Sequence, residues 1–269
     1  MNNVYLKAKN YIMDKGSDLQ KICCKLIDGT ATQQEVCNQL AKYQNPDGGF
    51  AKGIEIEYLG DASSVMSIAA ALSHIARMGL GDSKVYRDTV SYLKKVQCLD
   101  GSFDESDAFQ KLPHPPYMDQ GVYVEYKTGV IVKWLLAMGC QEKELINKAI
   151  SYMDKAFDEV SKENDIWSAI GYIGVYAQLP PSPKHEEIMG WCMKVFSSGE
   201  KTSMWQQYSG RIESGEPISQ HEVKAVLEAI KANQQADGAW QQNFGEYNRV
   251  WLAVYILQFI KQHMPKEIE

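Results

Sequence analysis

Residues 40–50 read LAKYQNPDGGF, and the same pattern occurs again at 93–103 (LKKVQCLDGSF) and at 230–240 (IKANQQADGAW). Each copy has an aliphatic residue, then Gln, two variable residues, Asp-Gly, a small residue and an aromatic ring. Internal repetition of this kind indicates a chain built from similar supersecondary units. The first two copies are far enough apart for two helices with their connections, so the predicted unit is a helical hairpin.

Helix signals surround the copies of this motif. Capping-box patterns at 32–35 (TQQE) and 219–222 (SQHE) predict the starts of the helices that lead into the first and third copies. Asp-Gly then ends each helix, because glycine adopts left-handed backbone angles without a steric penalty. The helix expected over 83–97 carries charges, whereas 62–76 is small and apolar on nearly all sides, which is typical of a helix buried all round.

The helical pattern continues between the second and third copies. Apolar residues recur at i, i+3 and i+4 in the segments 129–139, 146–160, 165–179 and 185–196, and no strand pattern competes with them. About eleven or twelve helices result, which corresponds to six hairpins. The sequence therefore predicts one all-α domain over residues 1–269, in which solvent-exposed outer helices alternate with buried inner helices.

Composition argues against several classes of protein. The chain has 269 residues, of which 45% are hydrophobic and 23% charged, as in an ordinary globular protein. A formal charge of -6, with no basic cluster longer than Lys94 and Lys95, argues against a nucleic-acid partner. No apolar run reaches the roughly 18 to 20 residues that span a bilayer, and no secretory-signal pattern is visible. Six scattered cysteines without a C-x-x-C pair fit the reduced thiols of a cytoplasmic protein, which is the location we expect.

The three Gln-x-x-Asp-Gly-x-aromatic segments resemble the QW motifs of the squalene cyclase and prenyltransferase repeat superfamily. Residues 47–75 and 112–118 (LPHPPYM) are also similar to single-domain bacterial proteins of this superfamily that are known as prenyltransferase-like. The resemblance implies an (α/α)6 toroid, with inner and outer helices around a central cavity. It also implies a structural role for Gln44, Gln97 and Gln234, each bonding the start of a neighbouring helix.

The residue clusters that carry chemistry in that superfamily are not found in this sequence. The nearest match to the Asp-x-Asp-Asp acid cluster is 104–107 (DESD), which lacks the middle acid. No Asp-Asp-x-x-Asp cluster is present to hold magnesium. His185 and Cys192 are too far apart for a zinc pair on one helical face, and no Asp-x-Cys opens a predicted inner helix. We therefore expect neither a metal nor another cofactor.

Polar residues precede two of the predicted inner helices and form the candidate catalytic set. In a toroid these helices begin at one mouth of the cavity, where their unsatisfied N–H groups favour an anionic or polar ligand. A histidine held between prolines has a stiff backbone and suits proton transfer near neutral pH. The candidates are Glu55, Glu57, Asp61, Asp104, Asp107 and His114.

Each candidate also has a structural alternative. Asp61 would cap its helix, Glu55 and Glu57 would be solvated, and His114 would make a structural hydrogen bond.

Aromatic residues and one arginine form the candidate ligand-binding set. Aromatic walls stabilise a carbocation or stack on a sugar, although most aromatic residues at helical spacing belong to the core. An arginine at the start of the last helix would bind an anionic head group or form a salt bridge. The candidates are Tyr117, Trp167, Trp205, Arg249 and Trp251.

Three functions compete at this stage. The leading hypothesis is an isoprenoid-handling transferase or cyclase with its ligand in the central cavity. The second is a carbohydrate-active (α/α)6 hydrolase or lyase. In it, Glu55 or Glu57 would act with Asp104 or Asp107 as paired carboxylates. The third is a non-catalytic binding or scaffold protein whose ring is filled by side chains such as Trp167 and Tyr172. The expected partner is a small isoprenoid or sugar, and the oligomeric state is left open.

Overall fold

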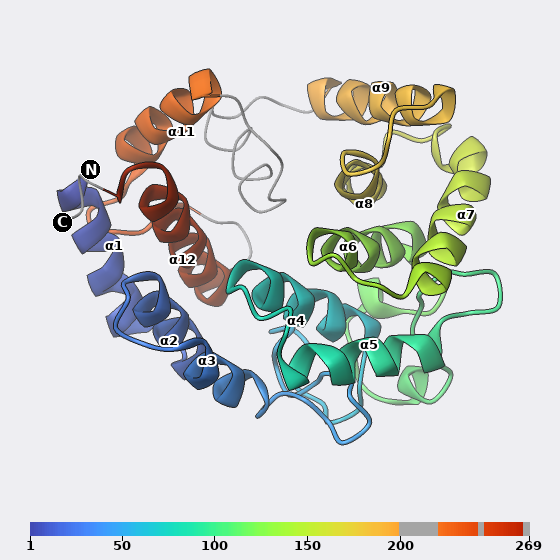
Figure 1. Ribbon diagram of the computed structural model, residues 1–269, viewed down its shortest axis with the longest axis horizontal. Coiled ribbons are helices and arrows are strands. Elements are labelled where there is room, and N and C mark those ends of the chain that lie inside the picture. The colour runs from blue at the N-terminus through green and yellow to red at the C-terminus, as the bar shows by residue number, and fades with distance from the viewer. Residues whose placement is uncertain (199–219, 242–244, 266–269) are drawn as a thin grey trace. The chain divides into compact units, whose positions relative to one another are not determined.

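The computed structural model describes residues 1–198, 220–241 and 245–265 of the chain (Figure 1). Over these ranges it contains eleven α-helices and no strand, which confirms the prediction of an all-α protein. The helices group into two compact units. The first unit joins residues 1–39 to the described residues after 200, and the second comprises residues 40–199.

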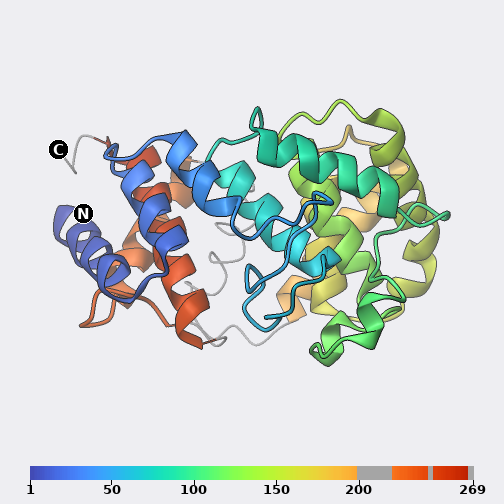
Figure 2. The same ribbon diagram turned by 90° about the horizontal axis from the view of Figure 1, so that it is seen from below.

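The second unit is built from two rows of helices, which Figures 1 and 2 show from two directions. Helices α4, α6 and α8 pack side by side in one row. Each of them is followed along the chain by a helix that packs on it, namely α5, α7 and α9. The bounds are Val65–Arg77 for α4, Lys84–Val96 for α5, Val124–Ala137 for α6, Lys143–Val160 for α7, Ile166–Tyr176 for α8 and Pro183–Ser198 for α9.

Glycines allow α6 and α8 to approach each other closely. A Cβ atom on Gly129 of α6 would lie 2.6 Å from the Cα atom of Gly171 of α8. One turn further along, a Cβ atom on Gly174 would lie 2.6 Å from the side-chain Cδ of Lys133. Because larger residues would force these backbones apart, the small residues in the apolar segments set the spacing of the first row.

The first unit packs the beginning of the chain against its later helices. Helix α12 is apolar over most of its length and contacts α1, α2 and α11. The bounds are Asn2–Lys15 for α1, Asp18–Ile27 for α2, Gln33–Leu40 for α3, Gln220–Asn233 for α11 and Gly245–His263 for α12.

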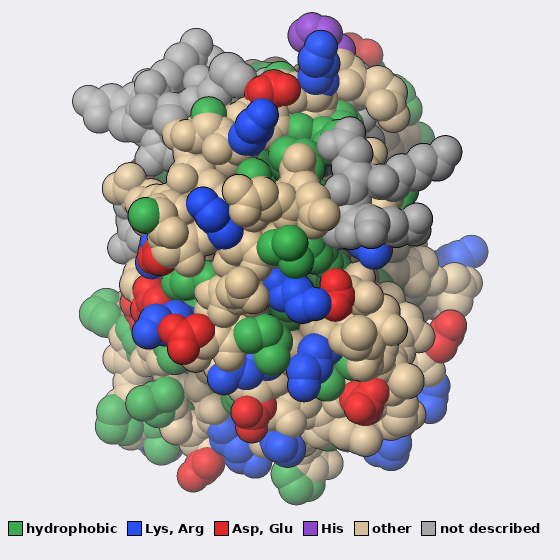
Figure 3. Space-filling model, turned by 90° about the vertical axis from the view of Figure 1, so that its left-hand side faces the viewer, with side chains coloured by type: hydrophobic (Ala, Val, Ile, Leu, Met, Phe, Trp, Pro, Cys, Tyr) green, Lys and Arg blue, Asp and Glu red, His purple; other side chains and the backbone are tan. Residues whose placement is uncertain are grey.

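On the face drawn in Figure 3, the coloured Lys and Arg side chains lie among Asp and Glu, with hydrophobic side chains scattered between them.

Capping boxes open two helices of the first unit. At the start of α3, the backbone amide of Thr32 donates to the carboxylate of Glu35 and the amide of Glu35 donates to the hydroxyl of Thr32, as the sequence predicts. A second box, which we did not predict, joins Ser17 and Gln20 at the start of α2. The box predicted at Ser219 lies outside the residues that the structure describes.

All three copies of the repeated motif fold into the same turn. The carboxylate of the motif Asp accepts a hydrogen bond from the amide two residues further on, at 2.8 to 3.1 Å. The motif Gly adopts φ between +96° and +99°, a conformation that favours glycine. The glutamine closes the turn by donating Nε2 to the glycine carbonyl, at 3.1 Å for Gln44, 2.9 Å for Gln97 and 2.8 Å for Gln234.

The same glutamines fasten each turn to the start of another helix. Each Nε2 also donates to a backbone carbonyl in the first turn of that helix, at 2.8 to 3.0 Å. The acceptors are Val85 of α5, Leu145 of α7 and Val4 of α1. Three residues beyond each acceptor, a carbonyl packs so closely that a Cβ atom on the motif glycine would lie 2.3 to 2.4 Å from its oxygen. The predicted structural role of the three glutamines is confirmed.

We expect Gly101→Ala to lower the free energy of unfolding by about 2 to 3 kcal/mol. The new Cβ atom would lie 2.3 Å from the carbonyl oxygen of Lys148, and the backbone at φ +99° is strained for alanine. Gly139→Ala is the matched control, because Gly139 also has a positive φ of +64° but has no atom within 4 Å of a built Cβ. Urea unfolding of both variants measures the difference, and equal losses would show that the contact with α7 contributes nothing.

Candidate functional site

Two irregular segments of the second unit, 51–64 and 104–123, carry all six predicted catalytic residues. The first leads into α4 and the second into α6. Helix α4 starts at Val65 rather than at Ala62, because the hydroxyl of Ser64 accepts the amide of Ser67 at 3.0 Å and caps the helix. The alternative in which Asp61 caps this helix is therefore wrong. Asp61 is exposed, and its backbone carbonyl accepts the side-chain amide of Asn45 at 2.7 Å.

Glu55, Glu57 and Tyr117 come together across the two segments. The hydroxyl of Tyr117 donates to Oε1 of Glu55 at 3.2 Å and also interacts with Glu57. Burial raises the pKa of Glu55, and the hydrogen bond from Tyr117 offsets part of that rise. Burial, together with the two nearby carboxylates, raises the pKa of the Tyr117 hydroxyl as well. Glu57 is exposed, so the two glutamates occupy different environments.

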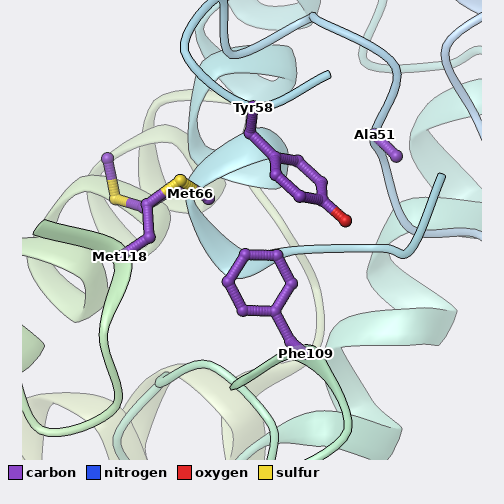
Figure 4. Close-up of a cluster of buried hydrophobic side chains, with 5 residues drawn as sticks. All are labelled: Ala51, Tyr58, Met66, Phe109 and Met118. Atoms are coloured by element: carbon purple, nitrogen blue, oxygen red, sulfur yellow. The ribbon is translucent and has the colours of Figure 1, made fainter. Parts of the chain in front are cut away.

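An apolar cluster lies beside this pair and is drawn in Figure 4. The ring of Tyr58 lies 4.9 Å from that of Phe109 at an angle of 59°, and Met118 lies beside Met66. Tyr117 and Tyr126 are partly buried and pack against the cluster. The cluster, which we call the aromatic cluster, comprises Ala51, Tyr58, Met66, Phe109 and Met118. The Glu55–Tyr117 pair is thus bordered by aromatic and thioether groups.

Asp104 is held in a buried ion pair and is not available as a free catalytic acid. Its Oδ1 atom accepts Nζ of Lys127 at 2.7 Å, and its Oδ2 atom accepts the amide of Gly121 at 2.6 Å. The side chain of Lys127 is 0% exposed. The expectation that Asp104 faces a ligand is therefore corrected, and Lys127 is a residue that we missed. Its signal in the sequence is a lysine in a largely apolar helix.

Glu105 fills the N-terminus of α4, where we expected a ligand. Its two carboxylate oxygens accept the amides of Val65 at 2.9 Å and Met66 at 3.0 Å, and the residue is 2% exposed. Burial raises the pKa of Glu105, against the opposite effects of the two amides and of Lys127. The helix end thus does bind an acidic group, as the helix dipole favours, but that group is a side chain of the protein itself.

His114 is bound within its own loop. Its Nδ1 atom lies 2.5 Å from the carbonyl oxygen of Leu112, and its Nε2 atom lies 3.0 Å from Oδ1 of Asp119. Its ring packs on Phe109 with a centroid distance of 4.8 Å. These contacts correspond to the structural alternative stated for His114. Asp107 is exposed in the same segment.

The predicted ligand-binding residues are divided between the two units. In the second unit, Trp167 packs edge-to-face on Tyr126, which contacts the aromatic cluster. In the first unit, Trp251 is buried in α12 and stacks on Tyr255. Trp205 lies outside the residues that the structure describes.

Arg249 stabilises the turn of the third copy of the motif. Its Nε atom donates to the carbonyl of Trp240 at 3.1 Å, its Nη2 atom pairs with Asp237 at 2.8 Å, and its guanidinium lies over the ring of Tyr11. The structure therefore agrees with the salt-bridge alternative for Arg249, because the guanidinium group already bonds residues of the first unit.

The described ranges 1–198, 220–241 and 245–265 contain neither a candidate metal site nor a candidate membrane-spanning helix. No group of three or more His, Cys, Asp or Glu side chains there could hold a metal ion. None of the helices there has the length and apolar character that crossing a membrane requires.

Comparison with known proteins adds no assignment. Neither the protein-family models nor the curated proteins contain a match to this chain. The likeness to the squalene cyclase and prenyltransferase superfamily therefore depends on the repeated motif and on residues 47–75 and 112–118 alone.

We expect Glu105→Ala to lower the free energy of unfolding by about 2 to 4 kcal/mol, because two buried amides of α4 lose their acceptors. Asp107→Ala removes an exposed carboxylate two residues away and should change stability by no more than about 0.5 kcal/mol. Chemical denaturation at neutral pH compares the two variants. Losses of similar size would mean that Glu105 does not stabilise the start of α4.

Proposed function

We propose that the chain forms an (α/α)6 toroid of the terpenoid cyclase and protein prenyltransferase type, and that it binds an isoprenoid or a similar apolar ligand. Two features support the ring. Alternate helices of the second unit pack side by side with a covering helix outside each one. In the first unit, Gln234 fastens α11 to α1 with the same pair of hydrogen bonds by which Gln97 fastens α5 to α7.

The observation that carries the proposed function is the Glu55–Tyr117 pair at the edge of the aromatic cluster. A carboxyl group whose pKa is raised by burial keeps its proton to higher pH and can act as a general acid. Aromatic faces beside it stabilise positive charge that develops on an apolar ligand. Tyr58, Phe109 and Tyr126 supply such faces. This combination suits an apolar substrate that is protonated or ionised.

The hydrolase or lyase hypothesis has less support. It required a glutamate to work with Asp104 or Asp107 as paired carboxylates on either side of a glycosidic bond. Asp104 is neutralised by Lys127, and Asp107 is exposed. The remaining pair, Glu55 and Glu57, shares one tyrosine and comes from one short segment. The scaffold hypothesis is the outcome expected if no ligand binds.

A closed ring predicts a compact particle. For a compact domain of this length we expect a radius of gyration of about 18 Å in small-angle X-ray scattering. The same hairpins stacked as an open spiral would scatter as a longer object. A radius several ångströms larger, in a sample shown to be monomeric, would contradict the toroid.

Binding of farnesol tests the ligand class. Isothermal titration calorimetry should detect farnesol, and should detect farnesyl diphosphate more weakly, because the exposed carboxylate of Glu57 repels the negative charges of the diphosphate. Glu55→Gln and Tyr117→Phe should each weaken farnesol binding by up to about tenfold, the effect of one lost hydrogen bond.

Asp107→Asn is the control for these variants, because it also removes a carboxylate from the same region but leaves the pair intact. Its affinity should equal that of the unmodified protein. The absence of any binding at millimolar farnesol would reject the proposed ligand class, and turnover of an acidic oligosaccharide would favour the carbohydrate hypothesis.

A further inference from the structure

One buried lysine holds both ends of the segment that carries Tyr117. Lys127 lies near the start of α6, and its Nζ atom donates to Oδ1 of Asp104 at 2.7 Å and to the backbone carbonyl of Asp119 at 2.9 Å. Asp104 and Asp119 are the first and last residues of the segment 104–119. The two ends of a long irregular segment are therefore joined through a single ammonium group.

The segment between these ends contributes several side chains to the candidate site. Phe109 and Met118 contribute side chains to the aromatic cluster (Figure 4). The hydroxyl of Tyr117 donates a hydrogen bond to Glu55. Glu105 anchors the beginning of the segment to the N-terminus of α4. The segment is thus held at its ends by Lys127 and Glu105, in addition to the contacts that Tyr117 makes itself.

A gain in stability alone does not account for the buried ammonium group of Lys127 in α6. Removing an ammonium group from water is costly, and buried ion pairs can often be replaced by apolar residues of similar size without loss. A methionine would fill the same volume in α6. What it would not supply are the two directed hydrogen bonds from Nζ to Asp104 and Asp119.

We propose that Lys127 is a positioning residue, which keeps the segment 104–119 closed so that the hydroxyl of Tyr117 stays on the carboxyl of Glu55. The inference rests on the proposed function in one respect, namely that the Glu55–Tyr117 pair is the acid of the site. The hydrogen bonds that define the positioning can be tested without any ligand.

The test measures the pKa of Glu55 by carbon NMR titration of glutamate-labelled protein. The Tyr117 hydrogen bond lowers this pKa, so Tyr117→Phe should raise it. The double variant Asp104→Asn with Lys127→Met removes the ion pair without changing the net charge. If Lys127 acts through Tyr117, this double variant should raise the pKa of Glu55 by the same amount, and adding Tyr117→Phe to it should have no further effect.

Two further variants control the measurement. Lys133→Met replaces a second buried lysine of α6, which packs on Trp134 and Gly174, and should leave the pKa of Glu55 unchanged. Asp104→Asn alone keeps one oxygen acceptor for Lys127 but places an amide N–H group against the amide of Gly121. It weakens the pairing without removing it, so it should give a smaller shift in the same direction. This milder change keeps the test valid if the double variant does not fold.

The outcomes separate the positioning role from the proposed function. An unchanged pKa of Glu55 in the double variant, or a shift that adds to that of Tyr117→Phe, would overturn the role of Lys127. Farnesol affinity, measured in parallel, should fall in the double variant to the level of Tyr117→Phe. If the unmodified protein fails to bind farnesol, the proposed function is rejected, while the NMR coupling still decides whether Lys127 positions Tyr117.

Discussion

The fold depends on a side-chain amide that makes two hydrogen bonds at once. In each copy of the motif, Nε2 of the glutamine bonds the carbonyl of its own turn and a carbonyl in the first turn of another helix. The glutamine amide thus stabilises the turn that follows one helix and also fastens this turn to the start of another helix. The glycine adds a steric condition, because a carbonyl oxygen lies where any other residue would carry its Cβ atom. The motif therefore joins parts of the chain through backbone atoms, which explains why the neighbouring side chains differ between copies.

Buried charge shapes the candidate site in the second unit. Glu105 satisfies the amides that α4 would otherwise present to a ligand, and Lys127 neutralises Asp104. With these groups committed to each other and to the backbone, Glu55 remains as a half-buried carboxyl that meets a neutral donor, the hydroxyl of Tyr117. The site is therefore simpler than its acidic sequence suggests, with one partly buried carboxyl, an exposed one beside it, one hydroxyl and an aromatic border.

The helices and the motif turns could be predicted because they depend on local periodicity, capping and glycine. The association of Glu55, Glu57 and Tyr117 was also within reach, since both segments precede predicted inner helices. The role of Glu105 was not, because its partners are amides of α4 that lie far away in sequence. Ser64 and Asp61 are both acceptable capping residues, and only the observed start of the helix distinguishes them.

The bond between Gln234 and Val4 has a consequence for how the protein is made. Helices α1 and α2 bury their apolar faces against α12, which leaves the ribosome much later, whereas residues 40–199 find their partners among near neighbours in the chain. Contacts between close neighbours form faster than contacts that close a long loop. We therefore expect residues 40–199 to fold during synthesis. Helices α1 and α2 would keep their apolar faces exposed, and accessible to chaperones, until α12 has left the ribosome.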